Sequence, residues 1–151
     1  MSDPANVHAT AIVIGTTGLL FTGPSGTGKS AIALHCIEEA RARGLFAALV
    51  SDDQVLISEA NGRLIARAPK SIAGLAEIRG AGIVSVKTIE AAVLNRAVRP
   101  IEAPFAERLP PEEERLEVLP ACFLPVTRLP LFLGATAFST LIAIHPELLH
   151  P

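Results

Sequence analysis

The sequence is poor in aromatic residues and in cysteine, and both shortages narrow the functions open to it. Its 151 residues include six phenylalanines but no tyrosine and no tryptophan. The aromatic stacking platforms of single-strand nucleic-acid binders are therefore disfavoured. The two cysteines, Cys36 and Cys122, are isolated, and neither belongs to a C-x-x-C pair. We expect both to be small buried apolar side chains in a reducing compartment.

The chain also lacks an excess of charge and a long apolar run. Its formal net charge is −2, which indicates no general attraction to nucleic acid or to a membrane surface. The longest apolar stretch, from Leu131 to Ile144, is shorter than the roughly 20 residues with which a helix crosses a bilayer. The N-terminus has no basic region followed by an apolar run, the mark of a signal peptide. The expectation is a cytoplasmic protein that binds neither nucleic acid nor membrane.

What the sequence does contain is a composition suited to one globular core. Hydrophobic residues make up 50% of the chain and charged residues 19%, which is typical of a folded domain. The length of 151 residues is close to the commonest domain size. The sequence therefore predicts a single domain over residues 1–151.

One glycine-rich stretch matches a phosphate-binding loop. The run Gly23-Pro24-Ser25-Gly26-Thr27-Gly28-Lys29-Ser30 fits the pattern G-x-x-x-x-G-K-[ST] without departure. Its glycines let backbone N–H groups curl around an anion, Lys29 brings a positive charge to the outer phosphates, and the Ser30 hydroxyl can ligate Mg²⁺. A short apolar strand is expected to enter the loop and a helix to leave it, which is the context that this motif requires.

Hydrophobic patterning and turn residues predict the other elements. Asn61-Gly62, set between two strand-like runs, is the strongest hairpin signal in the chain. Strands are expected at residues 7–14, 18–22, 45–50, 55–57, 63–67, 83–86, 98–103 and 123–128, helices at 29–43, 89–95 and 133–144, and loops at 70–82 and 104–120.

Acidic residues follow the predicted strand at 45–50, where a metal-orienting acid of a nucleotide site would lie. Because neighbouring side chains of a strand point to opposite sides, one of Asp52 and Asp53 is expected to face the metal or the cleft. The alternative is an ordinary strand-end turn with solvated acids. Glu77 and Arg79 fit a metal ligand and a phosphate clamp, although any exposed loop can carry such a pair. His8, alone near a strand start, is more often structural than catalytic.

Taken together, these motifs resemble a known bacterial family, the HPr kinase/phosphorylases. The resemblance covers residues 7–86 well and the rest loosely. It is carried by an upstream histidine, a doubled aspartate and a Glu-Ile-Arg-Gly block that follow one another in this order. These features stand here as His8-Ala-Thr, Gly18-Leu-Leu-Phe-Thr-Gly-Pro-Ser-Gly-Thr-Gly-Lys-Ser30, Leu49-Val-Ser-Asp-Asp-Gln-Val55 and Leu75-Ala-Glu-Ile-Arg-Gly-Ala-Gly-Ile83.

The resemblance implies a fold and an activity. The fold would be α/β: a P-loop nucleotide-binding core akin to phosphoenolpyruvate carboxykinase, with a mixed sheet flanked by helices. The activity would be ATP- and Mg²⁺-dependent phosphorylation of a serine of the phosphocarrier protein HPr. The reverse reaction would be phosphorolysis, which gives pyrophosphate. The family commonly forms hexamers, so a homo-oligomer is expected, and His8 would belong to the catalytic group.

The resemblance also assigns roles to the acidic residues and to the loop. Asp53 would accept the serine proton in the kinase direction and return it in phosphorolysis. Lys29 would clamp the transferred phosphate. Ser30 and Glu77 would ligate Mg²⁺, and Asp52 would support Asp53 or the metal.

The chain departs from the family pattern in three places. It begins almost at the catalytic core, so the usual N-terminal domain is expected to be missing. Arg108, in Glu107-Arg108-Leu109-Pro110, is the best match to a phosphate-contacting arginine. The stretch Pro125-Val126-Thr127-Arg128-Leu129-Pro130 lacks the glycine of the family's dephosphorylation motif and has its arginine shifted. Phosphorolysis is thus a less secure expectation than kinase activity.

Two other functions remain open on the sequence. The first is a nucleotide-responsive regulatory protein that kept the loop and acts through partner contacts. The second is a P-loop kinase for a small metabolite, which would need an arginine-bearing lid that only residues 108–115 could supply.

Overall fold

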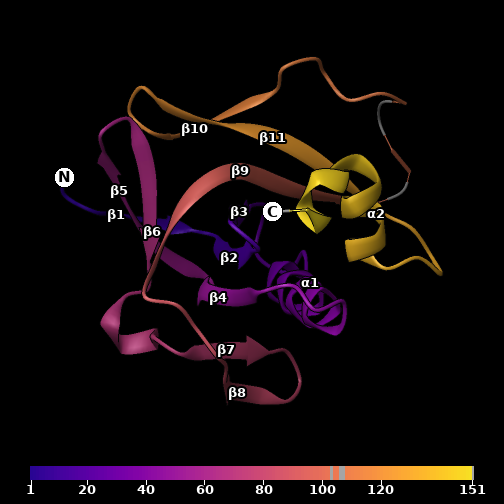
Figure 1. The fold of residues 1–151 in the computed structure, drawn as a ribbon, viewed down its shortest axis with the longest axis horizontal. Helices are drawn as coiled ribbons and strands as arrows, with labels where there is room; N and C mark the ends of the chain where they lie inside the picture. The colour runs from indigo at the N-terminus through magenta and orange to yellow at the C-terminus, as the bar shows by residue number, and fades with distance from the viewer. Residues whose placement is uncertain (103, 106–107, 151) are drawn as a thin grey trace.

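β-Branched and aliphatic runs separated by tight turns form the strands of this chain. The computed structural model describes residues 1–102, 104–105 and 108–150 (Figure 1). Its strands are β1 (Ala5–His8), β2 (Thr10–Ile14), β3 (Thr17–Phe21), β4 (Ala47–Ser51), β5 (Gln54–Ala60), β6 (Arg63–Arg67), β7 (Leu75–Ile78), β8 (Gly82–Ser85), β9 (Ala91–Glu102), β10 (Arg115–Leu119) and β11 (Cys122–Leu131). The helices are α1 (Lys29–Ala42) and α2 (Ala137–Ile144), with the 3-10 turns η1 (Lys70–Ile72) and η2 (Pro146–Leu149).

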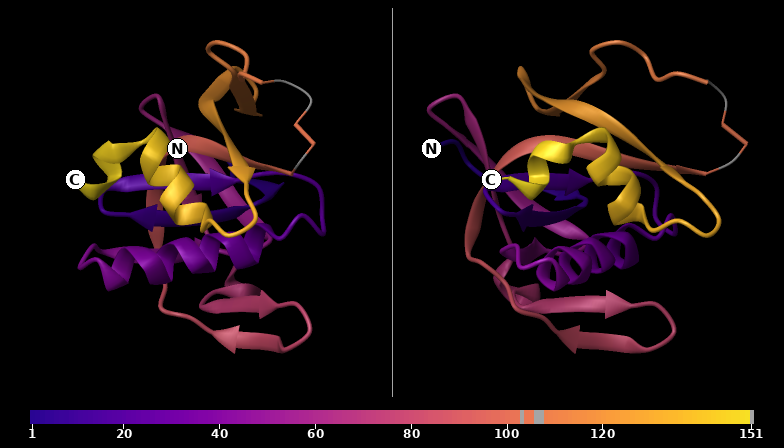
Figure 2. Two further views of the ribbon diagram at one scale, coloured as in Figure 1. Left: turned by 90° about the vertical axis from the view of Figure 1, so that its right-hand side faces the viewer. Right: turned by 45° about the vertical axis from the view of Figure 1, so that its right-hand side comes forward.

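The main sheet is mixed and is organised around the long strand β9. Its order is β1-β5-β6-β9-β3-β2-β4, and β11 joins the second half of β9 and carries β10. β9 runs parallel to β3 and β11 and antiparallel to β6. β7 and β8 form a separate hairpin below the sheet (Figures 1 and 2). The structure is therefore α/β with a mixed, curled sheet, as expected.

A bulge where β3 meets β9 fixes the approach of the two strands. The register shifts between Gly18 and Leu19, which pair with Leu94 and Arg96 and leave Asn95 as the extra residue. The Asn95 side chain accepts a hydrogen bond from Gly18 N at 2.7 Å. A Cβ on Gly18 would lie 2.0 Å from the carbonyl oxygen of Val93, so only glycine fits there.

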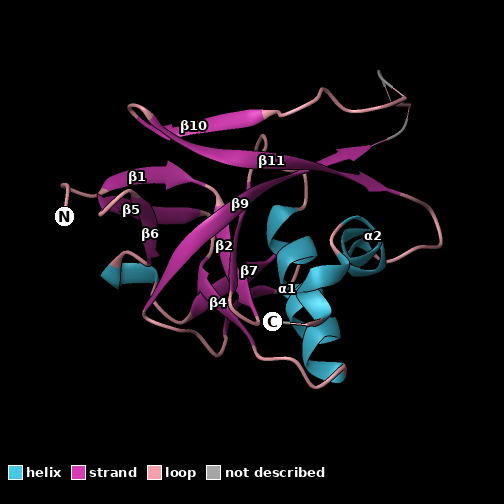
Figure 3. Ribbon diagram, turned by 45° about the horizontal axis from the view of Figure 1, so that its top comes forward, coloured by secondary structure: helices cyan, strands magenta, loops and turns pink. Residues whose placement is uncertain are grey.

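Two hydrophobic cores lie on the two faces of the sheet. One face packs against α1, α2 and the β7–β8 hairpin, and its centre includes Phe21 and Phe138 (Figure 3). The opposite face gathers Leu20, Val55 and Leu124. Cys36 is fully buried on α1, where burial raises the pKa of its thiol to about 12. The expected buried role is confirmed for Cys36, whereas Cys122 is only partly buried.

Several predicted elements are confirmed and three are wrong. α1 and the β5–β6 hairpin lie where they were expected. The helix predicted at 89–95 is instead the start of β9, because pairing with β6 and β3 outweighs the helix propensity of its alanines. The loop predicted at 104–120 contains β10, and the loop predicted at 70–82 contains β7. Ala103, the end of a predicted strand, and Ala106 and Glu107 of the predicted loop lie outside the described residues.

A chain of polar side chains ties the end of α2 to the sheet. Arg96 Nη1 donates to Thr127 Oγ1 at 3.1 Å, and this hydroxyl lies 2.6 Å from His145 Nε2. His145 Nδ1 lies 3.1 Å from Glu147 Oε1. Because Arg96 can only donate, all three contacts are satisfied when Thr127 donates to a neutral His145 and the Nδ1–H group donates to Glu147. These contacts accommodate a neutral His145.

Folding stability is expected to fall in acid because of this histidine. Burial, together with the neighbouring Arg96 charge, lowers the pKa of His145 below its ordinary value. His145 therefore binds a proton more tightly in the unfolded chain, where its pKa is about 6.5, than in the folded chain. The folding stability found above about pH 6.5 is lost as the pH falls through the lower pKa of the folded state. Thermal unfolding from pH 8 to pH 5 should show a steeper loss for the native chain than for His145→Gln. The exposed His150→Gln variant should keep the native slope, and equal slopes in all three proteins would contradict the prediction.

No helix among the described residues is both long and apolar enough to cross a membrane.

Candidate active site

The glycine-rich loop, residues 23–28, lies between the end of β3 and the start of α1. Gly26 and Gly28 adopt left-handed backbone angles (φ 84° and 81°), which residues other than glycine rarely adopt. Thr22 N bonds to Val98 O on β9 at 2.9 Å and so holds the start of the loop against the sheet. Thr27 Oγ1 donates to Pro24 O at 2.8 Å across the loop. These contacts place the N-terminus of α1, with its unpaired N–H groups, at the carboxyl end of β3.

Lys29 is folded against the loop that it follows. Its ammonium group donates to Gly23 O at 2.9 Å and to Pro24 O at 3.1 Å, and the residue is only 5% exposed. His8 Nε2 lies 3.5 Å from the same nitrogen and 3.0 Å from Ser25 Oγ. The positive charge is therefore held beneath the loop, beside the strand that carries His8.

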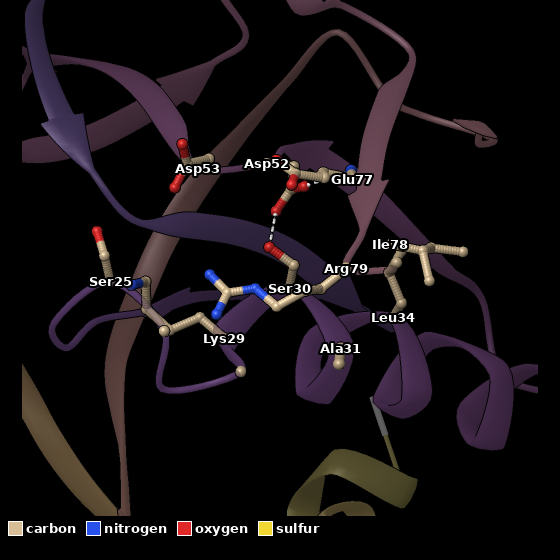
Figure 4. Close-up of a pocket in the computed structure, with 12 residues that line it drawn as sticks. Ser25, Lys29, Ser30, Ala31, Leu34, Asp52, Asp53, Glu77, Ile78 and Arg79 are labelled. Atoms are coloured by element: carbon tan, nitrogen blue, oxygen red, sulfur yellow. Dashed lines mark hydrogen bonds between the residues drawn. The ribbon is translucent and has the colours of Figure 1, made fainter. Parts of the chain in front are cut away.

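Asp52 is buried and fastens three elements together. Its Oδ1 accepts hydrogen bonds from Ser30 Oγ at 2.5 Å and from Thr10 Oγ1 at 3.0 Å. Its Oδ2 accepts from Glu77 N at 3.0 Å. The start of α1, strand β2 and strand β7 thus converge on one carboxylate. Figure 4 shows the contact between Ser30 and Asp52. The sequence alone does not indicate a role for Thr10, because a threonine in an apolar strand carries no distinctive signal.

Asp53, unlike its buried neighbour, is exposed to solvent. Its backbone is left-handed (φ 67°), an unusual conformation for a residue other than glycine. Its carboxylate lies 3.4 Å from His8 Nδ1, and its side chain is 59% exposed. The two aspartates thus differ in burial, but both line the same hollow, so the prediction that only one of them faces the cleft is wrong. A strained backbone that presents an accessible carboxylate is typical of functional sites.

A hollow of about 330 Å³ joins these groups, and we call it the loop hollow. Lys29 and Arg79 line it with positive charge, and Asp52, Asp53 and Glu77 with negative charge. Its other lining residues are Ser25, Gly26, Gly28, Ser30, Ala31, Leu34 and Ile78. Figure 4 shows the Arg79 side chain reaching over the loop, and its Nη1 lies 3.6 Å from where a Cβ on Gly26 would be.

The donor set fits a magnesium ion shared with a ligand. Among residues 1–102, 104–105 and 108–150, no three acidic, histidine or cysteine side chains cluster as a metal site of their own. The Ser30 hydroxyl and the Asp52 carboxylate meet in the loop hollow, and Glu77 lines the same wall. Mg²⁺ commonly takes one or two carboxylates and completes its shell with water and substrate phosphates. The residues present therefore match that pattern.

Arg108 is the predicted site residue that lies apart. It lines a second hollow of about 700 Å³ together with Phe105, Arg128 and Phe132, and this hollow shares no lining residue with the first. Glu107, which belongs to the same sequence motif, is outside the described residues. The described residues thus bring His8, the loop, both aspartates and Glu77 together, and leave Arg108 elsewhere.

The fold and this site define an α/β domain in which carboxylates face a glycine-rich loop at the start of a helix. The family described as "HPr Serine kinase C-terminal domain" matches residues 1–100, so the chain belongs to that family. The resemblance seen in the sequence is confirmed.

Curated relatives match the same part of the chain. The HPr kinase/phosphorylase of Clostridium beijerinckii is 37% identical over 89 residues, which are 59% of this chain and 28% of that protein. That of Clostridium tetani is 35% identical over 89 residues, which are 59% of this chain and 27% of that protein. The chain thus matches little more than a quarter of the length of these relatives.

A solved structure shares the fold over nearly the whole chain. The Hpr(Ser) kinase/phosphatase from Coxiella burnetii matches with a TM-score of 0.77 and 23% sequence identity. The match covers 95% of this chain and 89% of the other. The likeness therefore includes β11 and α2, which lie beyond the residues that the family matches.

Proposed function

We propose that this chain is a protein-serine kinase that transfers the terminal phosphate of ATP to a serine of an HPr-like phosphocarrier protein. The carrying observation is the exposed Asp53 carboxylate, which lies beside His8 at the mouth of a loop hollow that also holds Lys29. A serine hydroxyl bound beside Asp53 would lie within hydrogen-bond reach of a base and face a phosphate held by the loop. Membership of the family supports the choice of acceptor.

Each residue of the hollow then has a defined part. The backbone N–H groups of residues 23–30 bind the phosphates, and Lys29 moves from Gly23 O and Pro24 O to their oxygens. Asp53 accepts the proton of the serine hydroxyl as the new phosphorus–oxygen bond forms and the bond from the terminal phosphorus of ATP to the leaving ADP breaks. His8 holds the Asp53 carboxylate in place through the 3.4 Å contact.

Mg²⁺ belongs to the same proposal. Ser30 and Glu77 would hold it, and Asp52 would orient Ser30 through the 2.5 Å hydrogen bond. When bound, the ion neutralises charge on the phosphate oxygens. Arg108 lines the other hollow, so its proposed contact with phosphate requires the segment that carries it to move.

The reverse reaction is proposed for the same residues. An oxygen of inorganic phosphate attacks the phosphorus of phosphoserine, the bond to the serine oxygen breaks, and pyrophosphate forms. Asp53, protonated, returns its proton to the serine oxygen, because a base in one direction is an acid in the other. We also propose that the chain acts as one catalytic domain, as a cytoplasmic homo-oligomer.

Transfer of labelled phosphate tests the proposal directly. The chain, incubated with γ-labelled ATP, Mg²⁺ and an HPr-like carrier from the same organism, should place acid-stable label on one carrier serine. A carrier with that serine changed to alanine should take up none. Inorganic phosphate added to the purified phosphoprotein should release pyrophosphate. Label that appears only as free phosphate, or an unlabelled carrier with bound ATP, would overturn the kinase and favour a regulatory nucleotide binder.

A further inference from the structure

A second, smaller hollow lies on the far side of the acidic residues of the site. Its volume is about 130 Å³, and we call it the hairpin hollow. Asp52, Asp53 and Glu77 line both it and the loop hollow, so the carboxylates form a wall between the two. The rest of its lining comes from η1, from the β7–β8 hairpin and from Gln54 at the start of β5.

The chemistry of the hairpin hollow differs from that of its neighbour. Ile72, Leu75, Ala76 and Ile83 supply its walls, and neither lysine nor arginine lines it. Phosphate has no cation to bind there, whereas an apolar group would be sheltered from water. Ile83 is 71% exposed, so much of this apolar surface has no partner within the described part of the chain.

The carboxylates shared by the two hollows indicate what should occupy the hairpin hollow. A serine hydroxyl that gives its proton to Asp53 must lie about 3 Å from that carboxylate. The residues next to the serine are then only about 3.8 Å away along the acceptor backbone, which brings a neighbouring side chain within reach of the hairpin hollow. A cavity of about 150 Å³ lined by aliphatic side chains accepts benzene, so the 130 Å³ hollow has the size of one branched or aromatic side chain.

We propose that the hairpin hollow is the acceptor subsite of this enzyme and that it binds the apolar side chain adjacent to the target serine of the protein substrate. The inference rests on the proposed kinase function and specifies its substrate: a serine with an apolar neighbour. The polar rim of Asp53, Glu77 and Gln54 accepts N–H groups of the acceptor backbone. A small-molecule hydroxyl would leave the hollow empty, so the site distinguishes a protein acceptor from a metabolite.

The test is Ile83→Ser, assayed with the carrier protein as acceptor. Ile83 is largely exposed, so its loss leaves the core intact. The KM for carrier and the Kd of the serine-to-alanine carrier should both rise about tenfold, the loss of one buried aliphatic contact. The KM for ATP should stay within about twofold. Phe123→Ser, on the β10–β11 side of the molecule away from the hairpin (Figure 1), should change neither constant.

A double-mutant cycle makes the assignment specific. Replacing the apolar neighbour of the target serine by alanine in the carrier should raise KM by a similar factor. Combined with Ile83→Ser, it should add little, because both changes remove the same contact. If the two changes multiplied each other's effect on KM, or if Ile83→Ser left KM unchanged, the subsite would be overturned. Phosphate transfer by the native chain would still support the kinase. A native chain that leaves the carrier unlabelled would overturn the kinase and the subsite together.

Discussion

Asp53→Asn is expected to lower the rate of phosphoserine formation by about 100- to 10,000-fold, the range that a general base contributes. The amide has nearly the shape of the carboxylate but accepts no proton from the serine. Asparagine also tolerates the left-handed backbone found at this position (φ 67°), so the fold should be kept. The measurement is the initial rate of labelled phosphate transfer to the carrier, with ATP affinity determined by calorimetry on the same preparation.

ATP binding separates this role from the alternatives. The affinity of Asp53→Asn for ATP and Mg²⁺ should stay within about twofold of the native value, because the carboxylate is needed for the proton and not for the phosphates. Pyrophosphate formation in the reverse direction should fall with the kinase rate. Asp3→Asn, at the exposed N-terminus, is the matched control and should retain both activities. Equal losses of transfer and of ATP affinity would instead give Asp53 a metal-binding or structural role.

Gly18→Ala is expected to destabilise the fold by about 3 kcal/mol or more, at the upper end of what overpacking costs. The new Cβ would lie 2.0 Å from Val93 O and 2.9 Å from Val93 C, and both atoms belong to the backbone of β9. No rotamer relieves that contact, so β3 must move away from β9. The bond from Gly18 N to Asn95 would be strained by the same shift. Chemical denaturation of the two proteins measures the difference.

A second glycine shows whether the cause is the clash. Gly62 has a left-handed backbone (φ 77°) but open space around a Cβ. Gly62→Ala should therefore cost only about 1–2 kcal/mol, the penalty of that backbone region. If Gly18→Ala proved as mild as Gly62→Ala, the close approach of β3 to β9 would be wrong.

The sequence predicted those parts of the fold whose signals are local. α1 follows from the loop motif and an apolar stripe, and the β5–β6 hairpin follows from Asn61-Gly62. The second half of β9 was predicted as a strand, whereas its first half was predicted as a helix because it is rich in alanine, and only pairing with distant strands makes that half extended. The sequence of β10 does carry a strand signal, because polar and apolar residues alternate along Arg115-Leu-Glu-Val-Leu119, as they do in an edge strand.

In the candidate site, too, the sequence predicted the features with a local signal and not those that depend on distant contacts. The motif located the loop, but strand alternation does not extend to Asp52 and Asp53, because β4 ends at Ser51 and Asp53 has a left-handed backbone. Thr10 and the hairpin hollow depend on contacts between residues far apart in the chain, and no local pattern announces them. Arg108 was chosen by likeness to a motif, and the structure places it in another hollow.

The parallel pairing of β9 with β11 bears on how this protein can be divided. The family's match ends at residue 100, two residues before β9 ends and inside the stretch that pairs with β11. A fragment cut at that boundary would leave the second half of β9 as a bare edge, open to pairing with another chain. It would also lose Leu129, Phe138 and Leu141, which lie in the core beneath α1. The segment that the family matches is thus shorter than the unit that completes the sheet and the core.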